Sequence, residues 1–199
     1  MTDQSLSASN RLSDRAASHA DAFAALQAAE STEVLETVAA LIARSLNAGG
    51  KVIFFGNGGS AADAAHLSAE FVGRFRADRR PLASIALGTN PAVTTALGND
   101  YGFVESVFAR ELEALAQQGD VAVALTTSGR SPNILASLAR ARELGITTVA
   151  LCGAAHQLAG LVDQLIVIDS TQTALIQEMQ AVVGHILCEM VEDQMGFRQ

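Results

Sequence analysis

His66 and Glu70 stand four residues apart in an alanine-rich stretch that is typical of a helix. Residues at this spacing share one face of a helix, so the two side chains can meet. An imidazole and a carboxylate held together can bind zinc or act as an acid and a base. A single histidine on a helix is more often a surface or core residue, so only the pair favours chemistry.

A glycine turn precedes this helix, at Gly56, Gly58 and Gly59. Glycine permits the positive φ and the close backbone approach that a tight turn needs. Ser60 can cap the helix that follows. The start of such a helix directs free N–H groups and the positive end of its dipole outward, which makes an anion site. An anion site next to a His/Glu pair indicates chemistry on a phosphorylated molecule.

A second loop, residues 126–131, is rich in hydroxyl groups and lies between an apolar strand and a helix that begins at Pro132. Capping that helix needs one hydroxyl, and an ordinary capped turn is the simplest alternative. The surplus favours a phosphate site made by backbone N–H groups and side chains. The hydroxyls belong to Thr126, Thr127, Ser128 and Ser131.

Two polar residues, Gln177 and His185, interrupt an apolar helical pattern near the end of the chain. On this pattern alone, His185 is most simply a buried histidine whose ring nitrogens are hydrogen-bonded. Asn99 and Asp100 follow a glycine and would form a plain polar turn. The pattern by itself therefore assigns no function to these four residues.

The glycine turn also fits the fingerprint of dinucleotide-binding proteins, through Gly56, Gly58 and Ala61. That fingerprint needs an acidic residue at the end of the second strand to bind the ribose. The expected second strand ends in Ala-Leu-Gly-Thr at residues 86–89, without a carboxylate, so we do not expect NAD. The phosphate-loop motif ending in Gly-Lys-Ser or Gly-Lys-Thr is absent, which disfavours nucleoside triphosphate hydrolysis.

Runs of consecutive apolar residues, typical of strands buried on both faces, alternate with helical patterns along the chain. This alternation predicts an α/β fold with a doubly wound, five-stranded parallel sheet flanked by helices. Loops that follow parallel strands gather at one sheet edge, so the glycine turn and loop 126–131 should be neighbours. We expect strands at 52–55, 82–87, 121–125, 146–151 and 165–168, helices at 15–29, 32–46, 61–70, 91–97, 104–117, 132–144, 153–161 and 173–192, and a polar turn at 98–102.

The length of 199 residues favours one domain. We expect a flexible N-terminus at residues 1–13, N-terminal helices within residues 14–50, and the sheet domain at residues 51–199. Two helices before the first strand exceed what one sheet needs. Their apolar faces can pack on the sheet domain or on another subunit, and the sequence does not distinguish these.

The formal net charge is −8, and no basic cluster offsets it, so a nucleic-acid partner is not expected. The polar N-terminus lacks the apolar core of a signal peptide, and no apolar run is long enough to span a membrane. Cys152 and Cys188 lie inside apolar runs, which is typical of buried, reduced thiols. These features together predict a cytoplasmic protein.

The chain contains GNGGSAADAAH at residues 56–66 with Glu70 four residues later, GNDYGF at 98–103, TSGRSPN at 127–133, and IQE at 176–178 followed by GHILCEMVE at 184–192. This ordered set resembles the phosphoheptose isomerases, a family of sugar isomerase (SIS) domain proteins. The resemblance runs from about residue 32 to the end. It implies conversion of sedoheptulose 7-phosphate to D-glycero-D-manno-heptose 7-phosphate, the first step of ADP-heptose biosynthesis for lipopolysaccharide.

The resemblance also implies roles for residues. It makes Glu70 and His185 the acid–base pair of an enediol mechanism. It implies one zinc ion per subunit and a homotetramer whose neighbouring chains complete each active site. The implied zinc ligands are His66, Glu70, Gln177 and His185. The implied substrate-binding residues are Asn57, Gly58, Gly59, Ser60, Glu70, Asn99, Asp100, Thr126, Thr127, Ser128, Ser131 and Gln177.

Some positions depart from the family pattern. Thr126 stands where serine is usual, and Arg130 replaces a common asparagine or lysine. Ala155 and His156 occupy a site that is often Gly-Gly, and Gln180 stands where a histidine is common. Two alternatives follow: an isomerase for another ketose phosphate, or a non-catalytic sugar-phosphate sensor or DnaA-binding regulator of the same fold. The DnaA-binding branch lacks the glutamate and the late histidine present here, which favours an enzyme.

Overall fold

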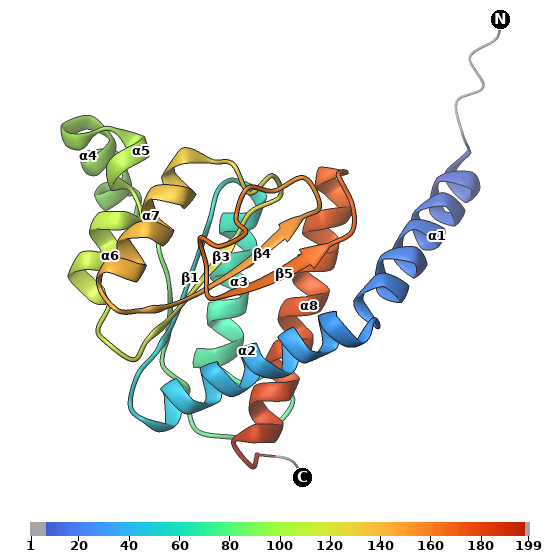
Figure 1. Ribbon diagram of the computed structural model, residues 1–199, viewed down its shortest axis with the longest axis horizontal. Helices are drawn as coiled ribbons and strands as arrows, with labels where there is room; N and C mark the ends of the chain where they lie inside the picture. The colour runs from blue at the N-terminus through green and yellow to red at the C-terminus, as the bar shows by residue number, and fades with distance from the viewer. Residues whose placement is uncertain (1–6, 198–199) are drawn as a thin grey trace, which may run out of the picture.

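Five apolar segments form one parallel sheet in the computed structural model, which describes residues 7–197 (Figure 1). The strand order is β2-β1-β3-β4-β5. This confirms the predicted five-stranded parallel sheet, although the second strand is shorter than expected. The strands are β1 (Val52–Gly56), β2 (Ser84–Ala86), β3 (Val121–Leu125), β4 (Thr147–Gly153) and β5 (Gln164–Ile168).

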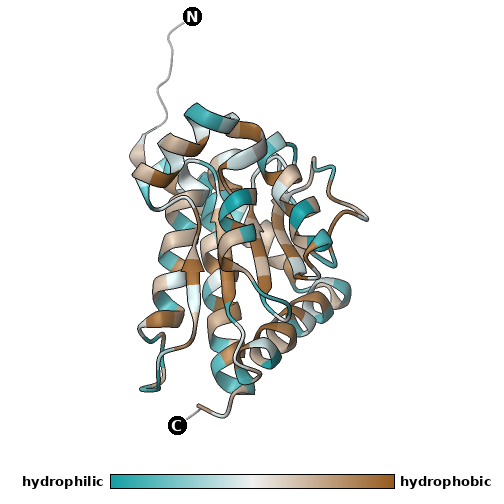
Figure 2. Ribbon diagram, turned by 90° about the vertical axis from the view of Figure 1, so that its left-hand side faces the viewer, coloured by the Kyte–Doolittle hydropathy of each residue, from teal (hydrophilic) through white to brown (hydrophobic). Residues whose placement is uncertain are grey.

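Helices cover both faces of the sheet, because alternate side chains of each strand point to opposite faces. Val52 and Phe54 of β1 pack in a core with α2 (Ala29–Asn47), α3 (Gly59–Val72) and α8 (Thr173–Gln194). Ile53 and Phe55 pack in a second core with α6 (Ala109–Leu115) and α7 (Pro132–Glu143). In Figure 2 the strands between these layers are mostly hydrophobic. The doubly wound prediction is therefore confirmed.

The register of the sheet places the loops that follow β1, β3 and β4 side by side. Gly56 pairs with Leu125, and Leu125 pairs with Leu151. These three residues stand at or near the carboxyl ends of their strands. The glycine turn and loop 126–131 therefore start from adjacent points on the same sheet edge, as predicted.

The first helix, α1 (Ala8–Leu26), extends away from the sheet (Figure 1). It begins inside the stretch that was expected to be flexible, because the Ser7 hydroxyl caps it by accepting a hydrogen bond from the Asn10 N–H at 3.2 Å. Residues 1–6 lie outside the described residues. Arg15 of α1 forms an ion pair with Glu178 of α8 at 3.1 Å, so the helix is tied to the domain near its middle.

The expected polar turn at residues 98–102 is wrong, because α4 (Pro91–Tyr101) continues through it. The helix ends only at Gly102, whose φ of 82° breaks the helical path. The expected helix at 104–117 is interrupted and becomes α5 (Phe103–Ser106) and α6. The Ser106 hydroxyl donates to the carbonyl oxygens of Leu97 and Gly102, which folds this short segment back on α4.

The expected helix at residues 153–161 is also wrong, since this segment is an irregular connection between β4 and β5. Both cysteines are free and buried, as expected. Burial raises the pKa of Cys152 and of Cys188 to about 12, so both are neutral thiols at neutral pH. Among the described residues, no helix is both long and apolar enough to cross a membrane.

Candidate active site

The glycine turn joins β1 to α3 in a conformation that only small residues allow. Gly58 has a φ of 57°. A Cβ atom on Gly59 would lie 2.6 Å from Nε2 of Gln177, so the α8 amide packs directly against the start of α3. The predicted strand–turn–helix is therefore present, with Gln177 beside it.

The predicted cap by Ser60 is wrong, because Ser60 lies within α3 and the N-cap is Gly58, without a side-chain capping bond. The N–H groups of Ser60, Ala61 and Ala62 donate to the carbonyl oxygens of Asn57 and Gly58, so the glycine turn closes onto the start of α3 at the carboxyl edge of the sheet.

Asn57, in the middle of the glycine turn, is held by a residue that sequence reasoning missed. The side-chain amides of Asn57 and Asn133 exchange two hydrogen bonds, of 2.9 Å and 2.8 Å. Asn133 is buried at the start of α7, directly after the hydroxyl loop. The amide pair therefore fixes the two predicted anion loops relative to one another.

Two of the four predicted hydroxyls shape their own loop. The Thr126 hydroxyl accepts from the Gly129 N–H at 3.2 Å, and the Ser128 hydroxyl accepts from the Arg130 N–H at 3.3 Å. Ser131 occupies the N-cap position of α7 without making a side-chain capping bond. Thr127 and Ser131 are half-buried, whereas Ser128 is exposed. The loop thus presents hydroxyl groups and a helix start at the same edge as the glycine turn.

Gln180 of α8 connects both loops to the same helix. Its side chain is fully buried, and its amide nitrogen donates to the carbonyl oxygens of Leu151 at 2.8 Å and Thr126 at 3.3 Å. Its amide oxygen accepts from the Ser60 hydroxyl at 3.4 Å. The sequence marked this position only as a departure from the family pattern, because a glutamine in a helix gives no sign of its partners.

The predicted acid–base residues converge, although 115 positions separate Glu70 from His185 in the sequence. Nε2 of His66 lies 2.8 Å from Nε2 of His185 and 3.8 Å from Oε1 of Glu70. One ligand atom from each of the three residues lies within 4.8 Å of the others. The His66 side chain is 47% exposed and that of Glu70 is 22% exposed, so the group is open to solvent. We call these three residues the His–Glu cluster.

Two further side chains interact with the His–Glu cluster. The ring of Phe75 packs against the His185 ring, with centroids 5.1 Å apart. Asp63 stands one turn before His66 on α3. Burial raises the pKa of Asp63, and the nearby charge of His66 lowers it in part. The cluster therefore combines an apolar wall with a second, partly buried carboxyl group.

Comparison with known proteins agrees with this geometry. The model of the SIS domain family matches residues 17–153. The chain is 50% identical to the phosphoheptose isomerase of Aquifex aeolicus, over 78% of this chain and 82% of that protein. It is 46% identical to that of Paramagnetospirillum magneticum, over 91% of this chain and 94% of the relative.

The chain belongs to the phosphoheptose isomerase family.

The structure of a family member from Francisella tularensis superposes with a TM-score of 0.87 at 30% identity. The superposition covers 94% of this chain and 100% of that one. The resemblance and the fold inferred from it are therefore confirmed. The match extends over the N-terminal helices as well as the sheet.

The His–Glu cluster fits the zinc ion that the resemblance to phosphoheptose isomerases implies. Two imidazole nitrogens and one carboxylate oxygen are a ligand set of catalytic zinc sites, which keep a fourth position open. The fourth implied ligand, Gln177, packs against Gly59. It lies eight residues from His185, which is ~12 Å along a helix. Its role as a zinc ligand stays a prediction.

Asn99 and Asp100, implied to contact the sugar, lie on α4 rather than in a turn. Both side chains are exposed, and the Asn99 amide donates to the Asp100 carboxylate at 2.7 Å. No residue of α4 is buried. The sugar contact of this pair stays a prediction, and an exposed helix is a place where a neighbouring subunit could complete a site.

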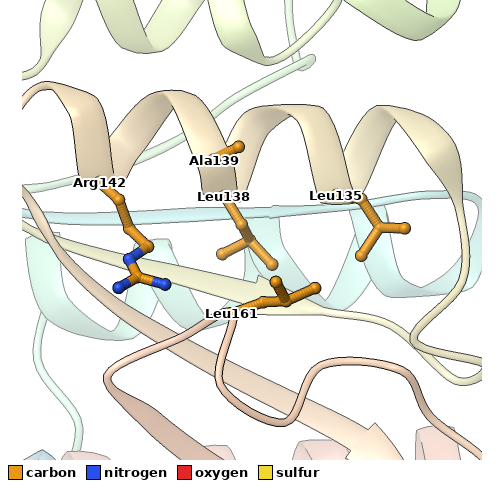
Figure 3. Close-up of a pocket in the computed structure, with 5 residues that line it drawn as sticks. All are labelled: Leu135, Leu138, Ala139, Arg142 and Leu161. Carbon is orange, nitrogen blue, oxygen red and sulfur yellow. The ribbon is translucent and has the colours of Figure 1, made fainter.

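A pocket lies between α7 and the connection from β4 to β5 (Figure 3). Its lining is apolar except for one guanidinium, and it contains neither a carboxyl nor an imidazole group. It therefore lacks the groups needed for acid–base chemistry. The lining residues are Leu135, Leu138, Ala139, Arg142 and Leu161.

Proposed function

We propose that this protein isomerises sedoheptulose 7-phosphate to D-glycero-D-manno-heptose 7-phosphate, the first step of ADP-heptose biosynthesis. The observation that carries this proposal is that Glu70 and His185 meet at His66, with the His185 ring nitrogen 2.8 Å from that of His66. The helices that carry these residues, α3 and α8, also border the anion loops. Membership of the phosphoheptose isomerase family supports the same reaction.

The phosphate group binds at the sheet edge in this proposal. Gly58 and Gly59, at the start of α3, supply backbone N–H groups, and the half-buried Thr127 and Ser131 supply hydroxyl groups. The chain has a net charge of −8, so local donors must hold the anion against the long-range field. Anchoring the phosphate fixes one end of the sugar and presents its carbonyl end to the His–Glu cluster.

Proton transfer then needs one base at carbon and one group at oxygen. The Glu70 carboxylate takes a proton from C1 of the ketose, while His185 gives a proton to the C2 carbonyl oxygen. The product is a neutral enediol. His185 next removes the proton from the O1 hydroxyl, and Glu70 returns its proton to C2, which yields the aldose. The isomerisation therefore consumes no further reactant.

Zinc would be held by His66, Glu70 and His185, with Gln177 as a further candidate. When bound, zinc polarises a carbonyl oxygen and stabilises negative charge on it. A carboxylate that binds a metal through one oxygen keeps its other oxygen for a proton. Glu70 can therefore serve as ligand and base in the same site. An imidazole nitrogen that binds zinc carries no proton, so zinc binding by His185 and proton transfer from it belong to alternative states of the site.

We further propose a homotetramer in a reducing, cytoplasmic environment. Two exposed apolar regions support self-association: Leu12, 71% exposed on the projecting α1, and the α4–α5 segment with Tyr101, Phe103 and Val104. Asn99 and Asp100 lie on that same segment, so a subunit contact there would bring them near a neighbouring site. Light scattering should give a mass of four chains; a monomer would contradict the proposal.

The first prediction concerns the proposed base. Glu70→Gln keeps the size of the side chain but removes the proton acceptor, so kcat should fall by about 10²–10⁴-fold. The measurement is turnover of sedoheptulose 7-phosphate together with uptake of deuterium from solvent at the reacting carbons. Glu33→Gln, at an exposed position of α2, is the matched control and should retain full activity.

Full turnover by Glu70→Gln would remove Glu70 as the base. Absence of deuterium uptake by the unmodified protein, with binding of the sugar phosphate retained, would instead favour the non-catalytic sensor. A panel of ketose phosphates with five to seven carbons would reveal an isomerase for another sugar.

A further inference from the structure

A buried ion pair joins the loop after α3 to the end of α8, farther along both helices than the His–Glu cluster. Nε of Arg79 lies 2.7 Å from Oε1 of Glu192, and the two side chains are 1% and 5% exposed. Neither residue belongs to the proposed site. Their contacts nevertheless reach both helices that build it.

Glu192 binds the loop that follows α3 through its carboxylate. Its carboxylate accepts hydrogen bonds from three successive backbone N–H groups, those of Phe75 at 3.2 Å, Arg76 at 3.1 Å and Ala77 at 3.0 Å. Three backbone donors on one carboxylate leave the loop little freedom. Phe75 is the residue whose ring packs against His185. Glu192 therefore fixes the apolar wall of the cluster.

Arg79 holds the end of α3 itself. Its guanidinium donates to the backbone carbonyl oxygens of Glu70 at 2.9 Å and Phe71 at 3.0 Å, with longer bonds to those of Gly73 and Arg80. The last carbonyl groups of a helix have no partners within the helix. Arg79 donates hydrogen bonds to these carbonyl groups, and one of the carbonyl groups belongs to Glu70, the proposed base.

We infer that Arg79 and Glu192 are positioning residues that set Glu70 and His185 relative to one another. Glu192 stands seven residues after His185, so the two share one face of α8. The pair thus joins the turn of α3 that carries the base to the helix that carries the imidazole. The desolvation free energy of a buried ion pair is about as large as the attraction between its charges, so a contribution to stability alone does not account for the Arg79–Glu192 pair. This inference rests on the proposed function.

The chain offers a matched control at the start of β3. Asp120 is fully buried and accepts from the backbone N–H groups of Lys51 at 2.9 Å and Gln117 at 2.8 Å, with the Lys51 ammonium at 2.7 Å. It is also a buried carboxylate with backbone donors and one cation. It stands just before β3, at the amino edge, and contacts no part of the proposed site.

The experiment compares Glu192→Gln with Asp120→Asn. Both changes remove a buried charge and should lower the melting temperature. In the metal-free protein, we expect the His185 ring resonances to move only in Glu192→Gln, because Phe75 shifts them by its ring current. In the same variant we expect zinc affinity and kcat to fall about 10–100-fold, as for other residues that orient metal ligands. KM should change less than threefold, since the phosphate loops are untouched.

Arg79→Lys is a second variant in case Glu192→Gln fails to fold. It keeps the charge but loses the planar fork that reaches several carbonyl oxygens. Unchanged His185 resonances and zinc affinity in folded variants, or equal changes in Asp120→Asn, would overturn the inference. A lack of turnover in the unmodified protein would count against the proposed function alone, because the resonances of the metal-free protein need no reaction.

Discussion

At the scale of single residues, buried amides arrange the anion loops. Asn133 pairs with Asn57 across the loops, and Gln180 joins the ends of β3 and β4 to Ser60. A buried amide can donate and accept without carrying charge. Such residues keep backbone N–H groups aimed at one point, which is what binding of a phosphate group requires.

Gln180→Met tests this role. Methionine fills a similar volume but leaves the carbonyl oxygens of Thr126 and Leu151 with fewer donors. We expect the free energy of unfolding to fall by ~1–3 kcal/mol. Calorimetry should show that binding of inorganic phosphate weakens several-fold while zinc binding does not change. Gln117→Met, at an exposed position, is the control. Equal loss of phosphate and zinc binding would point to general loosening instead.

At the scale of secondary-structure elements, the site is the seam between α3 and α8. Gln177 meets Gly59 at the start of α3, and His185 meets His66 near the middle of both helices. Next to these histidines, α8 comes so close to α3 that a Cβ atom on Gly184 would lie 2.5 Å from Cδ2 of Leu67. A glycine at this point lets the two helices bring their functional side chains together.

Gly184→Ala should therefore destabilise the protein, although alanine favours helices. We expect overpacking against Leu67 to cost ~1–3 kcal/mol in the free energy of unfolding, measured by urea denaturation. Gly98→Ala in α4 is the contrasting variant. Its Cβ would meet nothing closer than Phe103 Cδ2 at 3.8 Å, so helix propensity should stabilise by ~0.5–1 kcal/mol. A stabilising Gly184→Ala would show that the seam can widen freely.

At the scale of the whole molecule, stability in acid depends on the burial and hydrogen bonds of its carboxylates. Burial alone would raise the pKa of Glu192, but the N–H groups of Ala77, Arg76 and Phe75 and the guanidinium of Arg79 together lower it. The pKa of Glu111 is instead raised, chiefly by burial and against a hydrogen bond from the Gly88 N–H. The two groups therefore have opposite effects on stability as the pH falls.

Because the pKa of Glu192 is lower in the folded than in the unfolded state, the direction in which it changes stability with pH is defined. Glu192 contributes stability above its unfolded pKa, near the ordinary value of 4.5, and this contribution is lost as the pH falls through the folded pKa. Unfolding free energies measured by urea between pH 7 and pH 3 should therefore converge for the unmodified protein and Glu192→Gln below about pH 4.5. A constant difference down to pH 3 would contradict the lowered pKa.

Local pattern predicted the strands well and some connections badly. β1 and β3 are continuous apolar runs buried along their whole length, which is typical of central strands of a parallel sheet. A turn was predicted from Gly98, Asn99 and Asp100, but these residues lie within the α4 helix, which is capped by Asn90. The segment 153–161 has a helical composition but no helix. Packing outweighs weak propensities in such short segments.

The alternation of strands and helices, the parallel sheet, the edge where the loops meet and the family motifs were all predictable from the amino-acid sequence. These features depend on periodicity and turn chemistry within about 20 residues. The pairs of side chains that meet became known from the fold: His66 with His185, Asn57 with Asn133, and Arg79 with Glu192, separated by 119, 76 and 113 positions. Local patterns constrain the backbone of one segment, whereas such contacts depend on how whole helices pack.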